Sequence, residues 1–157
     1  MMFRNIDAAD SELQKALLLI ALWTPEDEPD HTADILEQPH IKEYYENWGG
    51  PEDIGFFALD SDQQPMGIIQ VRPKSSVTRQ YSEFPELAMA VHPDYQGRGV
   101  GKQLLAELFR RITVPGLRLG VHPENRAAIA LYKKFGFCHY ETPEKGFPQM
   151  VWHCKVV

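Results

Sequence analysis

The sequence predicts one α/β domain over residues 1–157, with a mixed, mostly antiparallel, twisted sheet of about seven strands flanked by about four helices. Three observations favour this class. Short apolar runs that stop at proline or glycine alternate with longer segments of helical periodicity. The chain has 157 residues, 43% of them hydrophobic, which is enough to bury one core. It shows neither an internal repeat nor a low-complexity segment that would divide it.

The first third of the chain is expected to contain one strand and two helices. Residues 3–6 form the strand, and residues 11–22 form a helix because their apolar positions recur with helical spacing. The acidic segment 24–38 is interrupted by prolines, which leaves room only for a short helix from His31 or Thr32 to Glu37. We interpret this acidic segment as a solvated loop or, alternatively, as a lid that attracts a cationic substrate. A second helix is expected at 41–48, before two glycines.

The remaining chain is expected to supply six strands and two helices. The strands are expected at 54–59, 66–71, 86–91, 117–121, 137–141 and 150–157, and the helices at 100–112 and 125–135. Most of these runs end at proline, glycine or a polar turn, which neither a strand nor a helix interior accepts readily.

A glycine-rich turn joins a strand to an amphipathic helix in residues 86–112, ELAMAVHPDYQGRGVGKQLLAELFRRI. The first turn of a helix has backbone N–H groups without partners and carries partial positive charge. The glycines let a ligand approach the backbone, and Arg98 and Lys102 add formal charge. The pattern therefore predicts an anion site suited to phosphate or pyrophosphate. A tight turn that binds nothing is the alternative interpretation.

The glycine spacing excludes two common phosphate-binding loops. In a Walker loop, Gln96 would replace the first glycine and Gln103 the required serine or threonine. In a dinucleotide fingerprint, Lys102 would replace the third glycine.

The run VHPDYQGRGVGKQLL resembles the acetyl-CoA loop of the GCN5-related N-acetyltransferases, the GNAT superfamily. The resemblance is firm over 86–137 and weak before Ile54, and the predicted element order is also that of the GNAT fold. It implies that the chain binds acetyl-CoA as acyl donor, with no metal. The residues that it places on the donor here are Met89, Ala90, Val91, Gln96, Gly97, Arg98, Gly99, Val100, Gly101 and Lys102.

Asn125 and Tyr132 begin and end a second motif, N-x-x-A-x-x-L-Y, and seven positions of helix place them on one face. Taken alone, Asn125 is typical of a helix N-cap and Tyr132 of a core aromatic. The run is similar to the GNAT segment N-x-x-A-x-x-L-Y-x-x-x-G-F. That resemblance implies that Asn125 binds the pantetheine arm and that Tyr132 lies near the thioester sulfur as general acid.

Glu86 is the predicted general base, because some GNAT members carry a catalytic glutamate at the start of this strand. Strand alternation places it on one face with Ala88 and Ala90. The alternatives are an exposed carboxylate without a catalytic role, a water relay, and His122 as the base. Members that acetylate ribosomal-protein N-termini carry a glutamate where this chain has Gly120, which argues against that activity.

The resemblance implies an acyltransferase that moves the acetyl group of acetyl-CoA to an amine of a small molecule or peptide by direct attack in a ternary complex. One alternative is a CoA-binding regulatory module without turnover, against which Tyr132 argues. The other is an acyltransferase that uses another acyl-CoA or a non-amine acceptor. The acceptor itself cannot be identified from the residues.

The net charge of −6 argues against a general nucleic-acid binder. No secretory pattern and no apolar run of about 18 residues is apparent, so we expect a cytoplasmic protein without a membrane partner. Cys138 and Cys154 lack metal-ligand spacing and are expected to be buried free thiols. A monomer and a homodimer both remain open.

Overall fold

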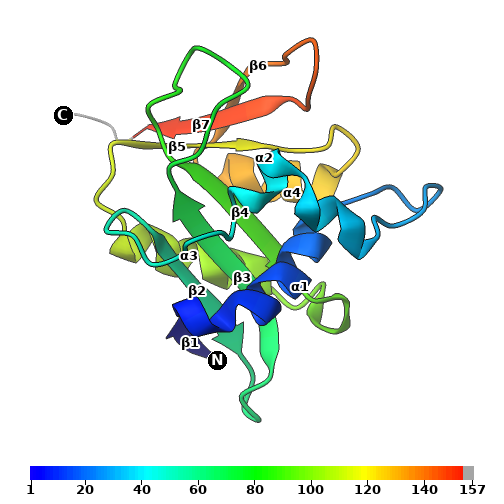
Figure 1. Cartoon of the computed structure of the whole chain (residues 1–157), viewed down its shortest axis with the longest axis vertical. Helices are drawn as coiled ribbons and strands as arrows, with labels where there is room; N and C mark the ends of the chain where they lie inside the picture. Colours follow the sequence, from blue (N-terminus) through cyan, green and yellow to red (C-terminus); the bar gives the residue numbers. More distant parts are fainter. Residues whose placement is uncertain (154–157) are drawn as a thin grey trace.

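Seven strands form one sheet in the order β1-β2-β3-β4-β5-β7-β6, in a computed structural model that describes residues 1–153 (Figure 1). Neighbouring strands are antiparallel except for the parallel pair β4–β5. The strands are β1 (Met2–Asn5), β2 (Ile54–Leu59), β3 (Pro65–Arg72), β4 (Glu86–Val91), β5 (Gly116–Gly120), β6 (Cys138–Glu141) and β7 (Gln149–His153). The predicted mixed sheet is confirmed. Its expected last strand reached 157, and residues 154–157 lie outside the described chain.

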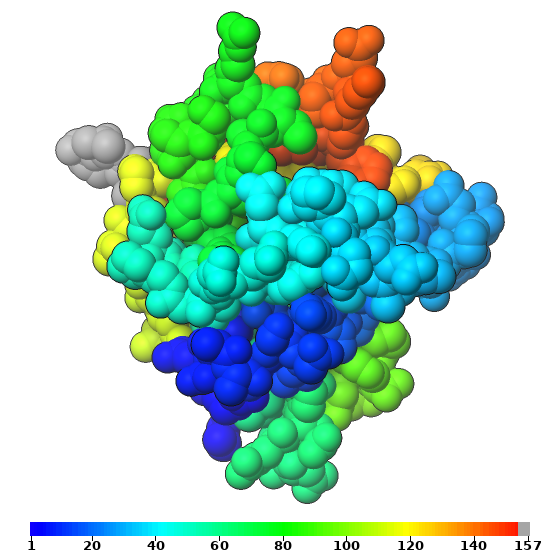
Figure 2. Space-filling view, in the orientation of Figure 1, coloured from blue at the N-terminus to red at the C-terminus, as the bar shows by residue number. Residues whose placement is uncertain are grey.

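Four α-helices cover the two faces of the sheet, as expected. They are α1 (Ser11–Ala21), α2 (Pro39–Lys42), α3 (Val100–Arg111) and α4 (Arg126–Lys134). The side chains of α1 and α2 meet that of Ala88 in β4, whereas α3 and α4 pack with the main core on the opposite face. Figure 2 shows the segment that contains α2 lying as a cyan band beside the blue α1 on one surface of the molecule.

The second helix is shorter than predicted, because α2 ends at Lys42 and turns continue to Asn47. The Arg72 side chain explains the difference. Its guanidinium forms an ion pair of 3.0 Å with Asp53 and donates to the backbone carbonyls of Glu43 and Glu46 at 3.2 and 2.8 Å. Those carbonyls are therefore engaged by a side chain from β3 and not by helical N–H groups. The expected short helix before α2 is a 3-10 helix, Ala33–Glu37.

Strands β4 and β5 diverge almost as soon as they meet. Their only paired position is Glu86 with Arg118. Beyond it β4 keeps its antiparallel partner β3, while β5 turns away with β7 (Figure 1). This split leaves one edge of β4 unpaired in the middle of the sheet.

Cys138 is exposed, so the prediction of a buried thiol there is wrong. The reason is that β6 is the edge strand of the sheet and its first residues face outward. Cys154 lies outside the described residues. Within residues 1–153, no helix combines the length and apolar character needed to cross a bilayer.

Candidate active site

The start of α3 offers backbone N–H groups to a ligand. Gly97 and Gly99 have φ of +77° and +79°, which glycine adopts at little cost. Gly99 is the N-cap of α3, and no side chain caps the helix. The first N–H groups of α3 therefore have no partner within the described chain, as the sequence predicted for an anion site.

A groove of about 520 Å³ runs from this helix start along β4 to α4. Nearly all residues predicted to hold the acyl donor line it: Met89, Ala90, Val91, Gln96, Gly97, Gly99, Val100, Gly101, Lys102 and Asn125. Arg98 lies outside the lining, with its guanidinium 5.5 Å from the ring centre of Tyr95. Lys134 of α4 also lines the groove, and the sequence reasoning did not single it out.

Every second residue of β4 directs its backbone N–H and C=O groups away from β3, where a ligand could bind them. His92 N donates to Met66 O of β3 at 2.8 Å, so Ala90, two residues earlier, also directs its backbone toward β3. Met89 and Val91 therefore direct theirs toward the split. The Val91 carbonyl accepts from the Gln96 side chain at 3.3 Å. The Val91 N–H faces the split, where it has no strand partner among residues 1–153.

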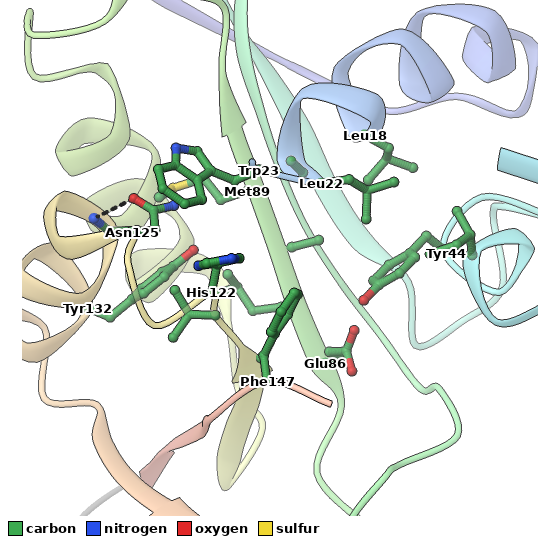
Figure 3. Close-up of a pocket in the computed structure, with 17 residues that line it drawn as sticks. Leu18, Leu22, Trp23, Tyr44, Glu86, Met89, His122, Asn125, Tyr132 and Phe147 are labelled. Carbon is green, nitrogen blue, oxygen red and sulfur yellow. Dashed lines mark hydrogen bonds between the residues drawn. The ribbon is translucent and has the colours of Figure 1, made fainter. Parts of the chain in front are cut away.

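A smaller cavity of about 120 Å³ adjoins the groove (Figure 3). The two spaces share a wall, which is formed by Ala21, Trp23, Met89, Asn125 and Ala128. Asn125 Oδ1 accepts from Ala128 N at 3.3 Å, which confirms its predicted role as N-cap of α4. Because only the oxygen is used in the cap, the amide nitrogen of Asn125 remains for a ligand.

Tyr132 projects from α4 with its hydroxyl toward this smaller cavity (Figure 3). Its ring packs on Phe137 with the ring centres 5.5 Å apart, and the residue is buried. Burial raises the pKa of the Tyr132 phenol well above its usual value, since a phenolate would lose its hydration. The phenol is therefore neutral at neutral pH, and its O–H can donate a hydrogen bond into the cavity.

Glu86 lies across the cavity and is buried, which rules out the expected alternative of an exposed carboxylate. Its Oε1 accepts from Arg118 Nη1 at 2.9 Å. The same guanidinium donates to the carbonyls of Phe84 and Lys74. The carboxylate faces Tyr44 (Figure 3). Burial first, and then the charge of Glu86, raise the pKa of the Tyr44 phenol well above its usual value.

His122 lines the cavity, but its hydrogen bond makes it a poor base. Its Nδ1 accepts from Glu124 N at 3.1 Å, so the neutral ring carries its proton on Nε2. That tautomer presents a donor, not an acceptor, to the cavity. Between the two candidates, the geometry favours Glu86.

Several residues of the cavity carried no local signal in the sequence. Trp23 follows α1, Tyr44 follows α2, Arg118 is in β5 and Phe147 is in the β6–β7 loop. Only the tertiary fold brings them together. Within residues 1–153, no group of His, Cys, Asp and Glu side chains is placed to hold a metal ion.

The comparisons with known proteins agree with this geometry. The model of the acetyltransferase (GNAT) family matches residues 18–137. Peptidyl-lysine N-acetyltransferase YjaB of Salmonella typhimurium is 29% identical over 121 residues, which cover 76% of this chain and 74% of that protein. Mycothiol acetyltransferase of Streptomyces coelicolor is 31% identical over 102 residues, which cover 62% of this chain and 30% of that protein.

One solved structure illustrates the likeness of fold. The yncA protein of Salmonella typhimurium, solved with its cofactor acetyl-CoA, has a TM-score of 0.72 and 19% sequence identity, with 100% of this chain and 95% of that chain covered. At this identity the likeness concerns the fold alone. The chain spans less than half the length of several curated relatives, namely 15%, 46% and 30% of three of them.

Proposed function

Because this chain belongs to the acetyltransferase (GNAT) family, we propose that it transfers the acetyl group of acetyl-CoA to an amine. The observation that carries the proposal is that two cavities lie side by side. The groove at α3 shares lining residues with the cavity that holds Glu86 and Tyr132. Donor and acceptor can therefore be held together, as direct attack in a ternary complex requires.

The donor is held by backbone groups and a few side chains. The free N–H groups at the start of α3 bind the pyrophosphate, with Lys102 adding positive charge. The open edge of β4 at Met89 pairs with the pantetheine arm as a further strand would. The amide nitrogen of Asn125 binds the same arm.

Three residues around the split carry out different steps of the acetyl transfer. The Val91 N–H polarises the acetyl carbonyl, since it points into the split and has no strand partner within residues 1–153. Glu86 takes the proton of the attacking amine, directly or through a water. The new C–N bond forms as the C–S bond breaks, and Tyr132 gives its proton to the departing thiolate. The acceptor is an amine of a small molecule or peptide.

The net charge and the exposed cysteine support a protein that acts in the cytoplasm and does not bind nucleic acid. The net charge of −6 disfavours nucleic acid. An exposed free thiol at Cys138 is typical of a reducing compartment.

A thermal-shift experiment tests the donor site. At about 100 times the dissociation constant, acetyl-CoA stabilises the native chain by about 2.7 kcal/mol and raises its melting temperature. Gly99→Glu places a carboxylate at the anion site and abolishes this shift. Gly49→Glu is the matched control, because Gly49 is also exposed with positive φ but lies outside the groove.

Turnover is then measured as free CoA released with a panel of amines. A native chain that shows no shift with acetyl-CoA overturns the proposal. Binding without release of CoA from any amine points instead to a CoA-binding module, and release with a different acyl-CoA points to another donor.

A further inference from the structure

Three rings from three separate segments lie against each other at the smaller cavity. The ring centres of Trp23 and His122 are 5.1 Å apart, and those of His122 and Phe147 are 5.0 Å apart. Trp23 follows α1, His122 follows β5, and Phe147 is in the β6–β7 loop. All three line the cavity, where Figure 3 shows them on the side of Tyr132. We call these three rings the aromatic row. An acceptor molecule can pack on their flat, apolar surfaces and make edge-to-face contacts with them.

The opposite wall is partly aliphatic. Leu18 and Leu22 from α1 and Ile41 from α2 contribute to it, beside Tyr44 and Glu86. The cavity has a volume of about 120 Å³, somewhat less than the dry, apolar cavity of about 150 Å³ that accepts benzene in another protein. An acceptor with a small, planar body therefore fits between the aromatic row and the leucines.

The charged residues of the cavity limit the charge that an acceptor can carry. Among its lining residues, all of which lie in the described part of the chain, Glu86 is the one carboxylate and no Lys or Arg is present. A second ammonium group on the acceptor would therefore find no partner within the cavity.

An acceptor carboxylate is disfavoured for a related reason. The nearest guanidinium, that of Arg118, is 1% exposed and already serves Glu86 and the carbonyls of Phe84 and Lys74. It cannot reach a ligand anion without leaving Glu86 unpaired, which is costly for a buried carboxylate.

We infer that the acceptor is a primary monoamine with a small, planar, apolar body and no second charge. Its amine meets Glu86, and its body packs against Trp23, His122 and Phe147. A polyamine or an amino acid would bring an unpaired charge into the cavity, and a peptide chain would have to displace the ring of Phe147. This inference rests on the proposed acetyl transfer, because it names the acceptor of that reaction.

Matched amines test the inference on the native chain. 2-Phenylethylamine, phenylalanine and 1,4-diaminobutane each present a primary amine, with the second adding a carboxylate and the third an ammonium group. A lysine-containing peptide represents polypeptide acceptors. With saturating acetyl-CoA, kcat/KM for 2-phenylethylamine is expected to exceed that for each of the others by about 100-fold, since an unpaired buried charge costs that much.

A variant of Phe147 tests whether the aromatic row is responsible for the preference for 2-phenylethylamine. Phe147→Ala is expected to raise KM for 2-phenylethylamine about tenfold, with kcat and acetyl-CoA affinity within twofold of the native values. Phe147 is 49% exposed, so the variant keeps its fold. Val77→Ala is the matched control, because Val77 is an exposed apolar residue of the β3–β4 loop outside the cavity, and it changes none of these values.

Each outcome is decisive. A higher kcat/KM for the diamine, the amino acid or the peptide overturns the inference, as does an unchanged KM in Phe147→Ala. If acetyl-CoA binds and another amine is acetylated while 2-phenylethylamine is not, the acceptor inference falls and the proposed function stands. If acetyl-CoA does not bind the native chain, both fall.

Discussion

Nη1 of Arg118 lies 2.9 Å from Oε1 of Glu86, and this buried ion pair stands at the one position where β4 and β5 pair. The two strands separate beyond it, so the pair closes the narrow end of the split. It also fixes the carboxylate that faces the acceptor cavity. One interaction thus contributes both to the architecture of the sheet and to the geometry of the proposed base.

We predict that Arg118→Met destabilises the fold strongly. The substitution leaves the buried Glu86 carboxylate without a partner, which costs about 3 to 5 kcal/mol in comparable cases. Urea unfolding followed by circular dichroism measures the free energy of unfolding. The double variant Glu86→Gln/Arg118→Met recovers part of the loss, because it removes the unpaired charge.

A surface arginine provides the control for this prediction. The Arg110 side chain is 76% exposed and pairs with Glu107 on α3, and Arg110→Met is expected to cost less than about 1 kcal/mol. Equal losses for the two arginine variants would contradict a special role of the buried pair.

We predict that Glu86→Gln lowers kcat/KM by about 100-fold, the usual contribution of a general base. The amide oxygen can still accept from Arg118, so the dissociation constant of acetyl-CoA stays within a few-fold. The rise of kcat/KM with pH that reports the base in the native chain disappears in the variant. Initial rates across pH and calorimetric titration with acetyl-CoA measure both effects.

Two variants sharpen that experiment. Glu83→Gln changes an exposed carboxylate in the loop before β4 and leaves kcat/KM unaltered. His122→Gln tests the other candidate base, and its effect on kcat/KM is expected to be smaller than that of Glu86→Gln because His122 Nδ1 already accepts from Glu124 N. A larger loss in His122→Gln would transfer the role of base to that residue.

We predict that Tyr132→Phe lowers kcat by about 10- to 100-fold and leaves acetyl-CoA affinity within a few-fold. The variant keeps the ring that packs on Phe137 and removes only the proton donor. Tyr45→Phe is the control, since it also removes a buried hydroxyl, one that donates to Leu36 O at 2.6 Å outside the cavity. Steady-state rates of CoA release measure kcat for the three proteins. An unchanged kcat in Tyr132→Phe would contradict the role of Tyr132 as general acid.

The elements that sequence predicted well are those set by local signals. Strands 54–59 and 86–91 have the predicted bounds, and α3 ends one residue before the expected 112. Apolar periodicity, Pro93 and the glycines before Val100 mark these boundaries within a few residues of chain. The glycine turn before α3 and the Asn125 cap were predictable for the same reason, since each is a local motif.

The errors arose where distant residues decide the outcome. The early end of α2 depends on Arg72, which lies in β3 and takes the Glu43 carbonyl that a longer helix would use. The exposure of Cys138 follows from the place of β6 at the sheet edge, which its own apolar neighbours do not reveal. The lining of the acceptor cavity comes from α1, α2, β5 and the β6–β7 loop together, so no spacing of residues in the sequence predicts it.

Buried tyrosines predict how stability depends on alkaline pH. Burial raises the pKa of the Tyr132 phenol in the folded state, and burial together with Glu86 raises that of Tyr44, whereas in the unfolded chain both stay near the ordinary value of about 10. Below pH about 10 both states hold these protons, so their contribution to stability is complete. As the pH rises further, the unfolded chain ionises first, and each tyrosine costs up to about 1.4 kcal/mol of unfolding free energy per pH unit.

We therefore expect Tyr132→Phe and Tyr44→Phe each to reduce the loss of stability between pH 9 and pH 11, and the double variant to reduce it more than either. Urea unfolding at each pH gives the free energies, and pH 8 is the reference because the phenols are neutral in both states there. Parallel pH curves for the native chain and the double variant would mean that these hydroxyls ionise as readily in the folded protein as in water, which would contradict the raised pKa of the two phenols in the folded state.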